Sequence, residues 1–203
     1  SRGLGDVYKR QVWMDTYTAE VGQQTLRSYI PKQLLLVGSA SYNDDGSTTE
    51  GTAEGGRQIV LYSVNDFNFE LEQIQSYAHV MHHEFAHILH QNVEYDAEFE
   101  KITPSYSSSW MQMNDETARS KGFITAYAFS SADEDFAEMV SIMLTNSPED
   151  WDNMIENAGN AAAVEALRKK EAIVVAYMKN NWGVNMKDFQ KEVVAAIEAA
   201  VRN

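Results

Sequence analysis

All five histidines of the chain lie within one segment of twelve residues, from His79 to His90. The segment reads HVMHHEFAHILH, and most of its other residues are apolar. From Phe69 to about Val93 the apolar residues recur with the period of an α-helix that packs against a core. Imidazoles on a buried helix face are costly unless they are hydrogen-bonded or bound. The segment therefore predicts either a metal site or a group of histidines that are satisfied without a metal.

His83, Glu84 and His87 form a His-Glu-x-x-His pattern inside this helix. Residues four positions apart on an α-helix lie one turn along and about 40° from eclipsed. His83 and His87 therefore project from one face and can bind a single ion. Glu84 lies about 100° around the helix, where it reaches a water near the metal instead of the metal itself. Zinc hydrolases use this arrangement of two histidine ligands and a neighbouring general base.

A catalytic zinc needs a third protein ligand, and the chain contains no cysteine. The position six residues after His87, which is a ligand histidine in one class of zinc peptidases, is occupied by Val93. The other three histidines lie too close along one helix to complete a tetrahedral site. We expect these residues to pack in the core or to support the ligands: His79, His82 and His90.

The segment SADEDFAEMVSIML supplies a better candidate for the third ligand. It predicts a helix with Ser131 or a neighbour as its cap and Pro148 after its end. Glu134 and Glu138 share one face of this helix, so Glu134 can complete a site of two histidines and one glutamate. Glu138 can accept a hydrogen bond from a ligand histidine and fix its tautomer. The alternative is an acidic first turn that only interacts with the helix dipole.

The net charge of the chain limits the classes of partner that it is expected to bind. Sixteen Lys and Arg residues stand against 30 Asp and Glu residues, which gives a formal net charge of −14. Binding to nucleic acid or to anionic lipid needs clustered cations, so neither is expected. No run of 18 apolar residues occurs, so no transmembrane segment is predicted.

Residues 1–11, SRGLGDVYKRQ, show no apolar periodicity, and we expect them to be a non-native or disordered leader. An ordinary flexible terminus is the alternative. Residues 12–203 are predicted to form a single domain. KQLLLVGSA and RQIVLYSVND read as strands, and the chain after Pro148 reads as helices that close the core.

Three segments resemble a known family: HHEFAHILHQ, GFITAYAFSSADEDFAEMVSIMLT and TAEGGRQIVLYSVNDF. They are similar to the zinc metallopeptidase lipoproteins of Bacteroidetes, which are associated with TonB-dependent import loci. The resemblance implies a zinc cofactor, a peptide or protein substrate, and an outer-membrane lipoprotein of the cell envelope with import components as partners. Members of this family begin with a lipoprotein signal and a lipidated cysteine. Neither occurs here, which is consistent with a truncated start.

The acidic segment also resembles the gluzincins of the lethal-factor type, in which the third ligand opens a Glu-x-x-Ala-Glu helix. In that arrangement a tyrosine seven residues before the ligand faces the metal. Tyr127 lies seven residues before Glu134, so the resemblance implies that Tyr127 stabilises the oxyanion. A tyrosine of the core is the alternative. The implied fold is an α+β gluzincin-like zincin, with a small sheet and the active-site helix before a mostly helical lobe.

The expected function is a zinc-dependent endopeptidase in which Glu84 serves as general base and then as general acid. The strand RQIVLYSV is expected to lie at the rim of the cleft and to pair with an extended substrate. One alternative is a binding module of the import complex with a structural zinc, held by a closed shell that includes His90. Another is a zinc hydrolase that acts on an acyl or amide group of a glycan-linked substrate.

Overall fold

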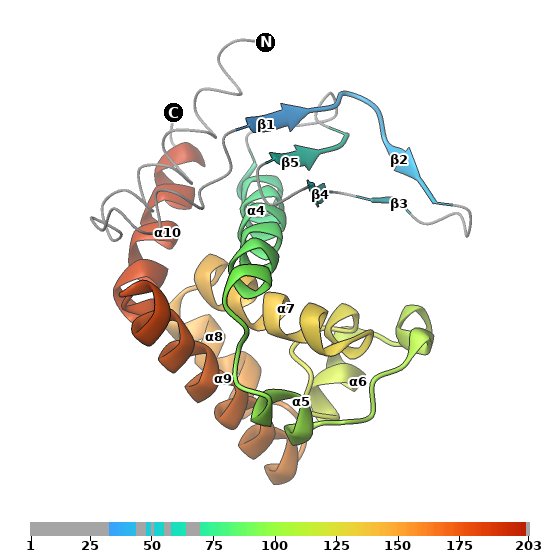
Figure 1. The fold of residues 1–203 in the computed structure, drawn as a ribbon, viewed down its shortest axis with the longest axis vertical. Coiled ribbons are helices and arrows are strands. Elements are labelled where there is room, and N and C mark those ends of the chain that lie inside the picture. The colour runs from blue at the N-terminus through green and yellow to red at the C-terminus, as the bar shows by residue number, and fades with distance from the viewer. Residues whose placement is uncertain (1–32, 44–47, 50, 55–57, 64–69, 202–203) are drawn as a thin grey trace.

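The fold is given by a computed structural model that describes residues 33–43, 48–49, 51–54, 58–63 and 70–201. The expected leader at residues 1–11 lies outside the described residues. A small sheet lies at one end of a long central helix, and the remaining helices pack around the other end (Figure 1). This arrangement confirms the predicted α+β class, in which a sheet and the histidine-bearing helix precede a mostly helical lobe.

The described strands form two small sheets: β1 (Gln33–Leu36), β5 (Gln58–Leu61) and β4 (Gly51–Glu54) in the first, and β2 (Ser41–Tyr42) and β3 (Thr48–Thr49) in the second. In the first sheet β5 is central, parallel to β1 and antiparallel to β4. Ile59, Val60 and Leu61 of β5 are buried. Their β-branched and apolar side chains suit a strand that is covered by neighbours.

The central position of β5 corrects one expectation. RQIVLYSV was expected to pair with an extended substrate, but both edges of β5 are already hydrogen-bonded to β1 and β4. A strand can bind an extended peptide only through a free edge. The expectation is therefore wrong for this strand, and the outer positions of the sheet belong to β1 and β4.

The histidine-bearing helix is α4 (Leu71–Asn92). Its buried apolar residues follow the 3–4 spacing of one helix face, beginning with Ile74, Ala78 and Met81. No glycine or proline interrupts this pattern, and the helix ends at Asn92, before Val93, whose backbone is extended. The sheet contacts this helix through β4 and β5.

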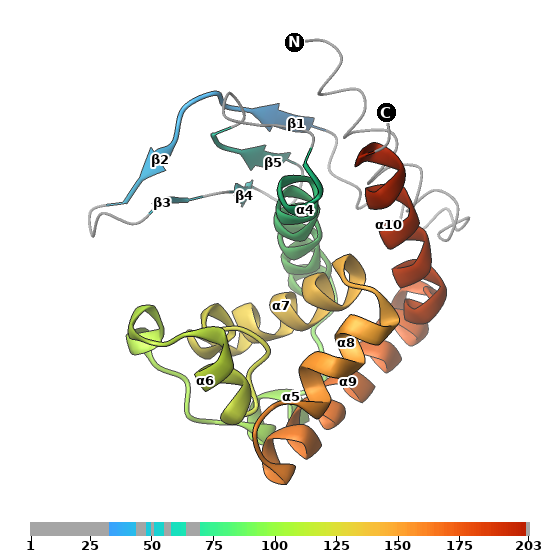
Figure 2. The ribbon, with the colours of Figure 1, turned by 180° about the vertical axis from the view of Figure 1, so that it is seen from behind.

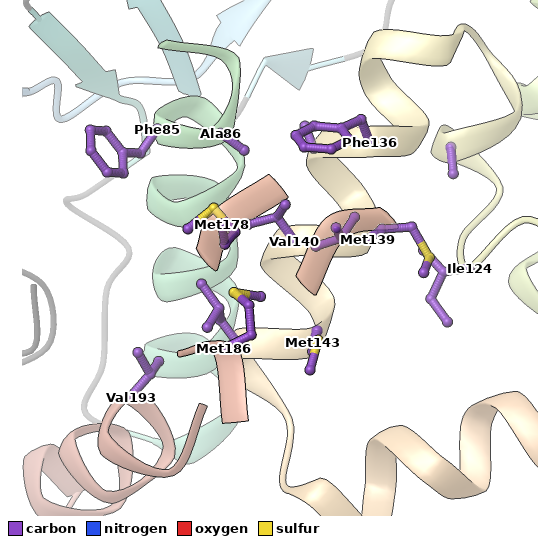
Figure 3. Close-up of a cluster of buried hydrophobic side chains, with 14 of the residues drawn as sticks. Phe85, Ala86, Ile124, Phe136, Met139, Val140, Met143, Met178, Met186 and Val193 are labelled. Carbon is purple, nitrogen blue, oxygen red and sulfur yellow. The ribbon is translucent and has the colours of Figure 1, made fainter. Parts of the chain in front are cut away.

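The acidic segment forms α7 (Ala132–Thr145), and Ser131 caps it by accepting a hydrogen bond from the backbone N–H of Glu134. One stripe of α7 is apolar, and it packs against α4 over much of its length. Figure 3 shows Phe136, Val140 and Met143 of α7 gathered with Phe85 and Ala86 of α4 in one apolar cluster. This packing sets the position of the acidic residues of α7 relative to the histidines.

Residues 94–130, all of them described, contain no strand. They form short helical turns instead: α5 (Glu98–Ile102), η3 (Ser108–Gln112), α6 (Asp115–Ser120) and η4 (Tyr127–Phe129). The serine-rich segment at residues 105–109 leads into the 3₁₀ turn η3, where the hydroxyl of Ser107 accepts a hydrogen bond from the backbone N–H of Ser109.

Three helices complete the lobe, as predicted: α8 (Pro148–Glu156), α9 (Ala161–Trp182) and α10 (Met186–Val201). They wrap around one side of α4 and α7, which is clearest from behind (Figure 2). Gly183 ends α9 with a left-handed φ of 70°, a conformation that glycine adopts at little cost. Among the described residues, no helix is both long and apolar enough to cross a membrane.

An ion pair that the sequence did not suggest lies inside this lobe. Lys170 of α9 and Asp135 of α7 are both 0% exposed, and the Lys170 ammonium donates to the Asp135 carboxylate and to the carbonyl of Gly122. The ammonium also lies 4.1 Å from the centre of the Phe123 ring. Burial raises the pKa of Asp135 to about 6 and lowers that of Lys170, although their mutual attraction opposes both shifts. The pair joins α9 to α7 beside the candidate site.

We predict that Lys170→Met destabilises the protein by about 3–5 kcal/mol, because it leaves the carboxylate of Asp135 buried without its cation. Denaturation in urea measures the loss. The double variant Lys170→Met with Asp135→Asn should recover part of it, since no charge is then left unpaired. Lys169→Met is the control, because that lysine is exposed and pairs with the exposed Glu165. A Lys170→Met variant as stable as this control would contradict the prediction.

Candidate metal centre

The two histidines of the motif meet on one face of α4. His83 and His87 lie one turn apart, with ring centres separated by 4.8 Å, and their Nε2 atoms are 3.1 Å apart. His83 is 6% exposed. The helix alone brings the two nitrogens together, because four residues make slightly more than one turn.

Glu134 joins the two imidazoles from α7. Its Oε2 atom lies 2.9 Å from Nε2 of His83 and 3.1 Å from Nε2 of His87. Zinc bonds of 2.0–2.2 Å in a tetrahedron separate neighbouring donor atoms by about 3.3 Å. The three donors therefore fit zinc after an outward movement of a few tenths of an ångström. The structure brings together the three side chains that were predicted as ligands.

A second group of possible ligand atoms shares His83 with the first. It comprises His79 Nε2, His83 Nδ1 and Glu138, whose Oε1 atom lies 2.7 Å from each of the two nitrogens. The other carboxylate oxygen of Glu138 accepts a 2.6 Å hydrogen bond from Thr125. A neutral imidazole has one free lone pair, so His83 can serve only one group as a metal ligand. The group with Glu134 is the better candidate, because its residues line two cavities together with Glu84, whereas the residues of the second group line one of these cavities.

Glu138 then has the supporting position that was predicted for it. It is 2% exposed and lies behind His83, on the side of the ring away from Glu134. Burial would raise the pKa of Glu138, but the neighbouring His79 and His83 hold it well below the usual value. An ionised Glu138 accepts the hydrogen on Nδ1 of His83, and Nε2 is left to face the candidate metal position.

The charges at the centre are strongly coupled. Burial would lower the pKa of His83, but hydrogen bonds to Glu134 and Glu138 outweigh it and raise the pKa to about 10. Burial would likewise raise the pKa of Glu134, but its interactions with His83 and His87 lower it to about 2. Without a metal, the centre is therefore an imidazolium between two carboxylates.

Glu84 and Tyr127, the two residues predicted to act on substrate, border the centre. Glu84 lines both adjoining cavities, one with His87 and the other with His83. Tyr127 is 38% exposed, and its ring centre lies 5.8 Å from that of His83. Burial and the charge of Glu134 raise the pKa of Tyr127 above its usual value, so its phenol stays protonated and can donate a hydrogen bond.

The two cavities differ in chemistry. One, of about 830 Å³, has a lining rich in carboxylates, and none of the described residues that line it is a lysine or arginine. The carboxylates belong to Glu84, Glu94, Glu100, Asp133 and Glu134. The other, of about 730 Å³, is lined in part by Trp110 and Tyr127, whose rings pack edge to face at 4.9 Å. Glu84 and Glu134 border both cavities. A substrate that crosses the centre would therefore meet an acidic side and an aromatic side.

The remaining histidines have distinct positions. His79 contacts Glu138, and His90 lies behind His87, with Nε2 of His90 2.8 Å from Nδ1 of His87. His82 points elsewhere in the core and packs edge-on against Phe189; burial, aided by the charge of His79, lowers its pKa to about 3. Sequence spacing did not assign these contacts.

Thr125 and Trp110 were also missed by the sequence analysis. The hydroxyl of Thr125 donates a hydrogen bond to Glu138, and the ring of Trp110 packs against the ring of Tyr127. Neither belongs to a motif or to the periodic face of a long helix. No signal in the sequence alone would have identified them.

Comparisons with known proteins bear on this centre. Residues 7–187 match the sequence family described as "Putative zinc-binding metallo-peptidase". The chain is also similar to a solved structure, described as "a putative zinc-binding metallo-peptidase from Bacteroides caccae ATCC 43185", with 33% identity and a TM-score of 0.83. That similarity covers 98% of this chain and 77% of the solved one. No curated protein matches the chain.

We predict that zinc binding at pH 7.5 releases at least one proton, because the raised pKa of His83, about 10, keeps Nε2 protonated in the metal-free protein. The direction of the pH dependence follows from competition, since zinc and a proton need the same lone pair of His83. Apparent affinity should therefore rise with pH up to about 10 and fall as pH decreases. Calorimetric titration in two buffers of different ionisation enthalpy measures the released protons. Zinc binding without proton release would contradict this protonation state.

Proposed function

Since the chain belongs to this family of zinc-binding metallo-peptidases, we propose that it is a zinc-dependent endopeptidase of the gluzincin type. His83, His87 and Glu134 would hold the metal. The observation that carries the proposal is the approach of two imidazole nitrogens and one carboxylate oxygen to within 3.1 Å of one another, beside Glu84.

When bound, zinc supplies a Lewis acid that lowers the pKa of water to about 7 and polarises a carbonyl group. The residues of the chain provide the proton transfers. Glu84 takes a proton from the attacking water and later delivers it to the leaving amine. Tyr127, whose phenol is protonated, donates a hydrogen bond to the oxyanion that develops on the carbonyl oxygen.

The accessibility of the centre favours a hydrolase over a structural zinc. The side chains of His87 and Glu134 are 15% and 23% exposed and border cavities, which leaves room for water and substrate. A closed shell with His90 as fourth ligand is disfavoured, because His90 faces the far nitrogen of His87. A hydrolase for acyl or amide groups of glycan-linked substrates would use the same centre. Peptides and glycan-linked amides should therefore be assayed together.

Two further expectations from the sequence resemblance stay proposals. They are attachment to the outer membrane as a lipoprotein and partnership with TonB-dependent import components. Proteolytic accessibility on intact cells and co-purification with such components would test them.

We predict that Glu84→Gln keeps zinc but lowers hydrolysis by several orders of magnitude, because the amide cannot accept the proton of water. Peptide hydrolysis measures the loss, and elemental analysis of the purified protein measures bound zinc. Glu72→Gln is the matched control, since Glu72 is an exposed residue in the first turn of the same helix. Turnover in Glu84→Gln equal to that of the control would remove Glu84 as the base.

A preference for basic substrates is expected from the acidic cavity. A lysine or arginine side chain of a peptide would meet carboxylates there, and the described residues of the lining include no lysine or arginine that would compete for them. We predict that kcat/KM is higher for peptides with such a residue beside the scissile bond than for peptides with glutamate at the same position. The difference should shrink at high salt, because charges near solvent are screened.

Glu100→Gln should reduce this preference, since Glu100 lines the acidic cavity. Glu149→Gln is the control, because Glu149 is exposed on α8 and its loss changes the net charge of the chain equally. Equal effects of the two substitutions would show that the cavity does not select the side chain.

A further inference from the structure

The two candidate ligands on α4 are supported in different ways. Nδ1 of His83 meets the buried carboxylate of Glu138, which comes from α7, at 2.7 Å. Nδ1 of His87 meets another imidazole, Nε2 of His90, at 2.8 Å. His90 lies three residues further along α4 and is 7% exposed, so water has little access to this contact. The centre therefore has one carboxylate support and one histidine support.

The contact with His90 restricts the tautomers of both rings. If Nε2 of His87 faces a metal, the hydrogen of that ring resides on Nδ1 and is donated to the neighbouring nitrogen. Nε2 of His90 must then be the acceptor, and the hydrogen of His90 resides on its own Nδ1. This arrangement places both hydrogens on the sides of the rings that face away from the candidate metal position.

The surroundings of His90 hold its ring in this orientation. Nδ1 of His90 lies 4.0 Å from Oδ1 of Asp133, and the hydroxyl of Tyr95 donates to the same oxygen at 2.7 Å. The ring of His90 packs edge-on against Tyr95 and Phe136, with centres 5.6 Å and 6.0 Å apart. Asp133 thus attracts the N–H side of His90, and the acceptor side is turned toward His87.

We propose that His90 is a positioning residue for metal binding, which accepts the Nδ1 hydrogen of His87 and keeps Nε2 of His87 unprotonated and aimed at the zinc. The inference rests on the proposed zinc centre and adds a residue to it. His90 touches neither metal nor substrate. Without the acceptor, His87 can adopt the tautomer with hydrogen on Nε2, which has no lone pair for zinc.

The test compares zinc affinity in variants of the full chain, measured by competition with a chelator of known affinity. His90→Phe keeps a ring but cannot accept a hydrogen bond, and it should weaken zinc binding about 10–100-fold. His90→Gln offers an amide oxygen in a similar place and should recover most of the loss. If His90→Phe does not fold, His90→Leu replaces it, since it also lacks an acceptor.

His82→Phe is the matched control, because His82 is a buried histidine of the same helix that packs against Phe189 instead of the centre. It should leave zinc affinity within about threefold of the unmodified chain, whatever it does to the denaturation midpoint. The absorption spectrum of the cobalt-substituted protein gives a second readout. It should keep the same band intensity in His90→Phe, since no ligand is removed.

The outcomes separate this inference from the function on which it rests. Unchanged zinc affinity in His90→Phe, with zinc bound by the unmodified chain, would overturn the positioning role and leave the zinc centre intact. A loss as large as in His87→Ala, with altered cobalt bands, would make His90 a ligand and also overturn it. Failure of the unmodified chain to bind zinc would overturn the proposed function and this inference together.

Discussion

The centre depends on the apolar packing of α7 against α4. The polar groups that could bind a metal come from two helices, and these helices pack against each other through buried apolar side chains such as Phe136, Val140 and Met143. Burial of one such side chain contributes about 1.5–3 kcal/mol, whereas a single hydrogen bond contributes about 1 kcal/mol net. The hydrophobic contact therefore determines where the carboxylates lie, and the polar contacts refine their orientation.

Burying several ionisable groups beside this contact is possible because they compensate one another. Glu138 accepts from two histidines and a threonine, and Asp135 meets a buried lysine on the adjacent side of α7. Each group would be costly alone in a medium of low polarity. Glu134 borders both cavities and its side chain is 23% exposed, whereas Glu138 borders one of them and is 2% exposed. Glu134, near the start of α7, is therefore accessible to a metal and a substrate, and Glu138, one turn later, supports His83.

Much of this centre could be predicted from sequence, since helical periodicity fixes which residues share a face. His83 with His87, and Glu134 with Glu138, follow from a spacing of four residues. Contacts between distant segments could not be predicted in this way. The central place of β5 depends on its pairing with two other strands. The Lys170–Asp135 pair depends on the crossing of α9 and α7. The role of Thr125 depends on the 3₁₀ turn that follows it, where the backbone N–H of Ala128 donates to its hydroxyl. Whether His90 supports His87 depends on ring rotamers, which spacing along a helix does not determine.

The separation of the donors along the chain has a consequence for biosynthesis. His87 and Glu134 lie 47 residues apart, and His83 and Glu138 lie 55 residues apart. A newly made chain that has formed α4 but has not yet docked α7 brings together only two of the three candidate ligands. Under the proposed function, such a chain could not cleave its neighbours during synthesis. Latency before completion of folding would then need no inhibitory segment, because proteolytic competence arises only with the finished tertiary structure.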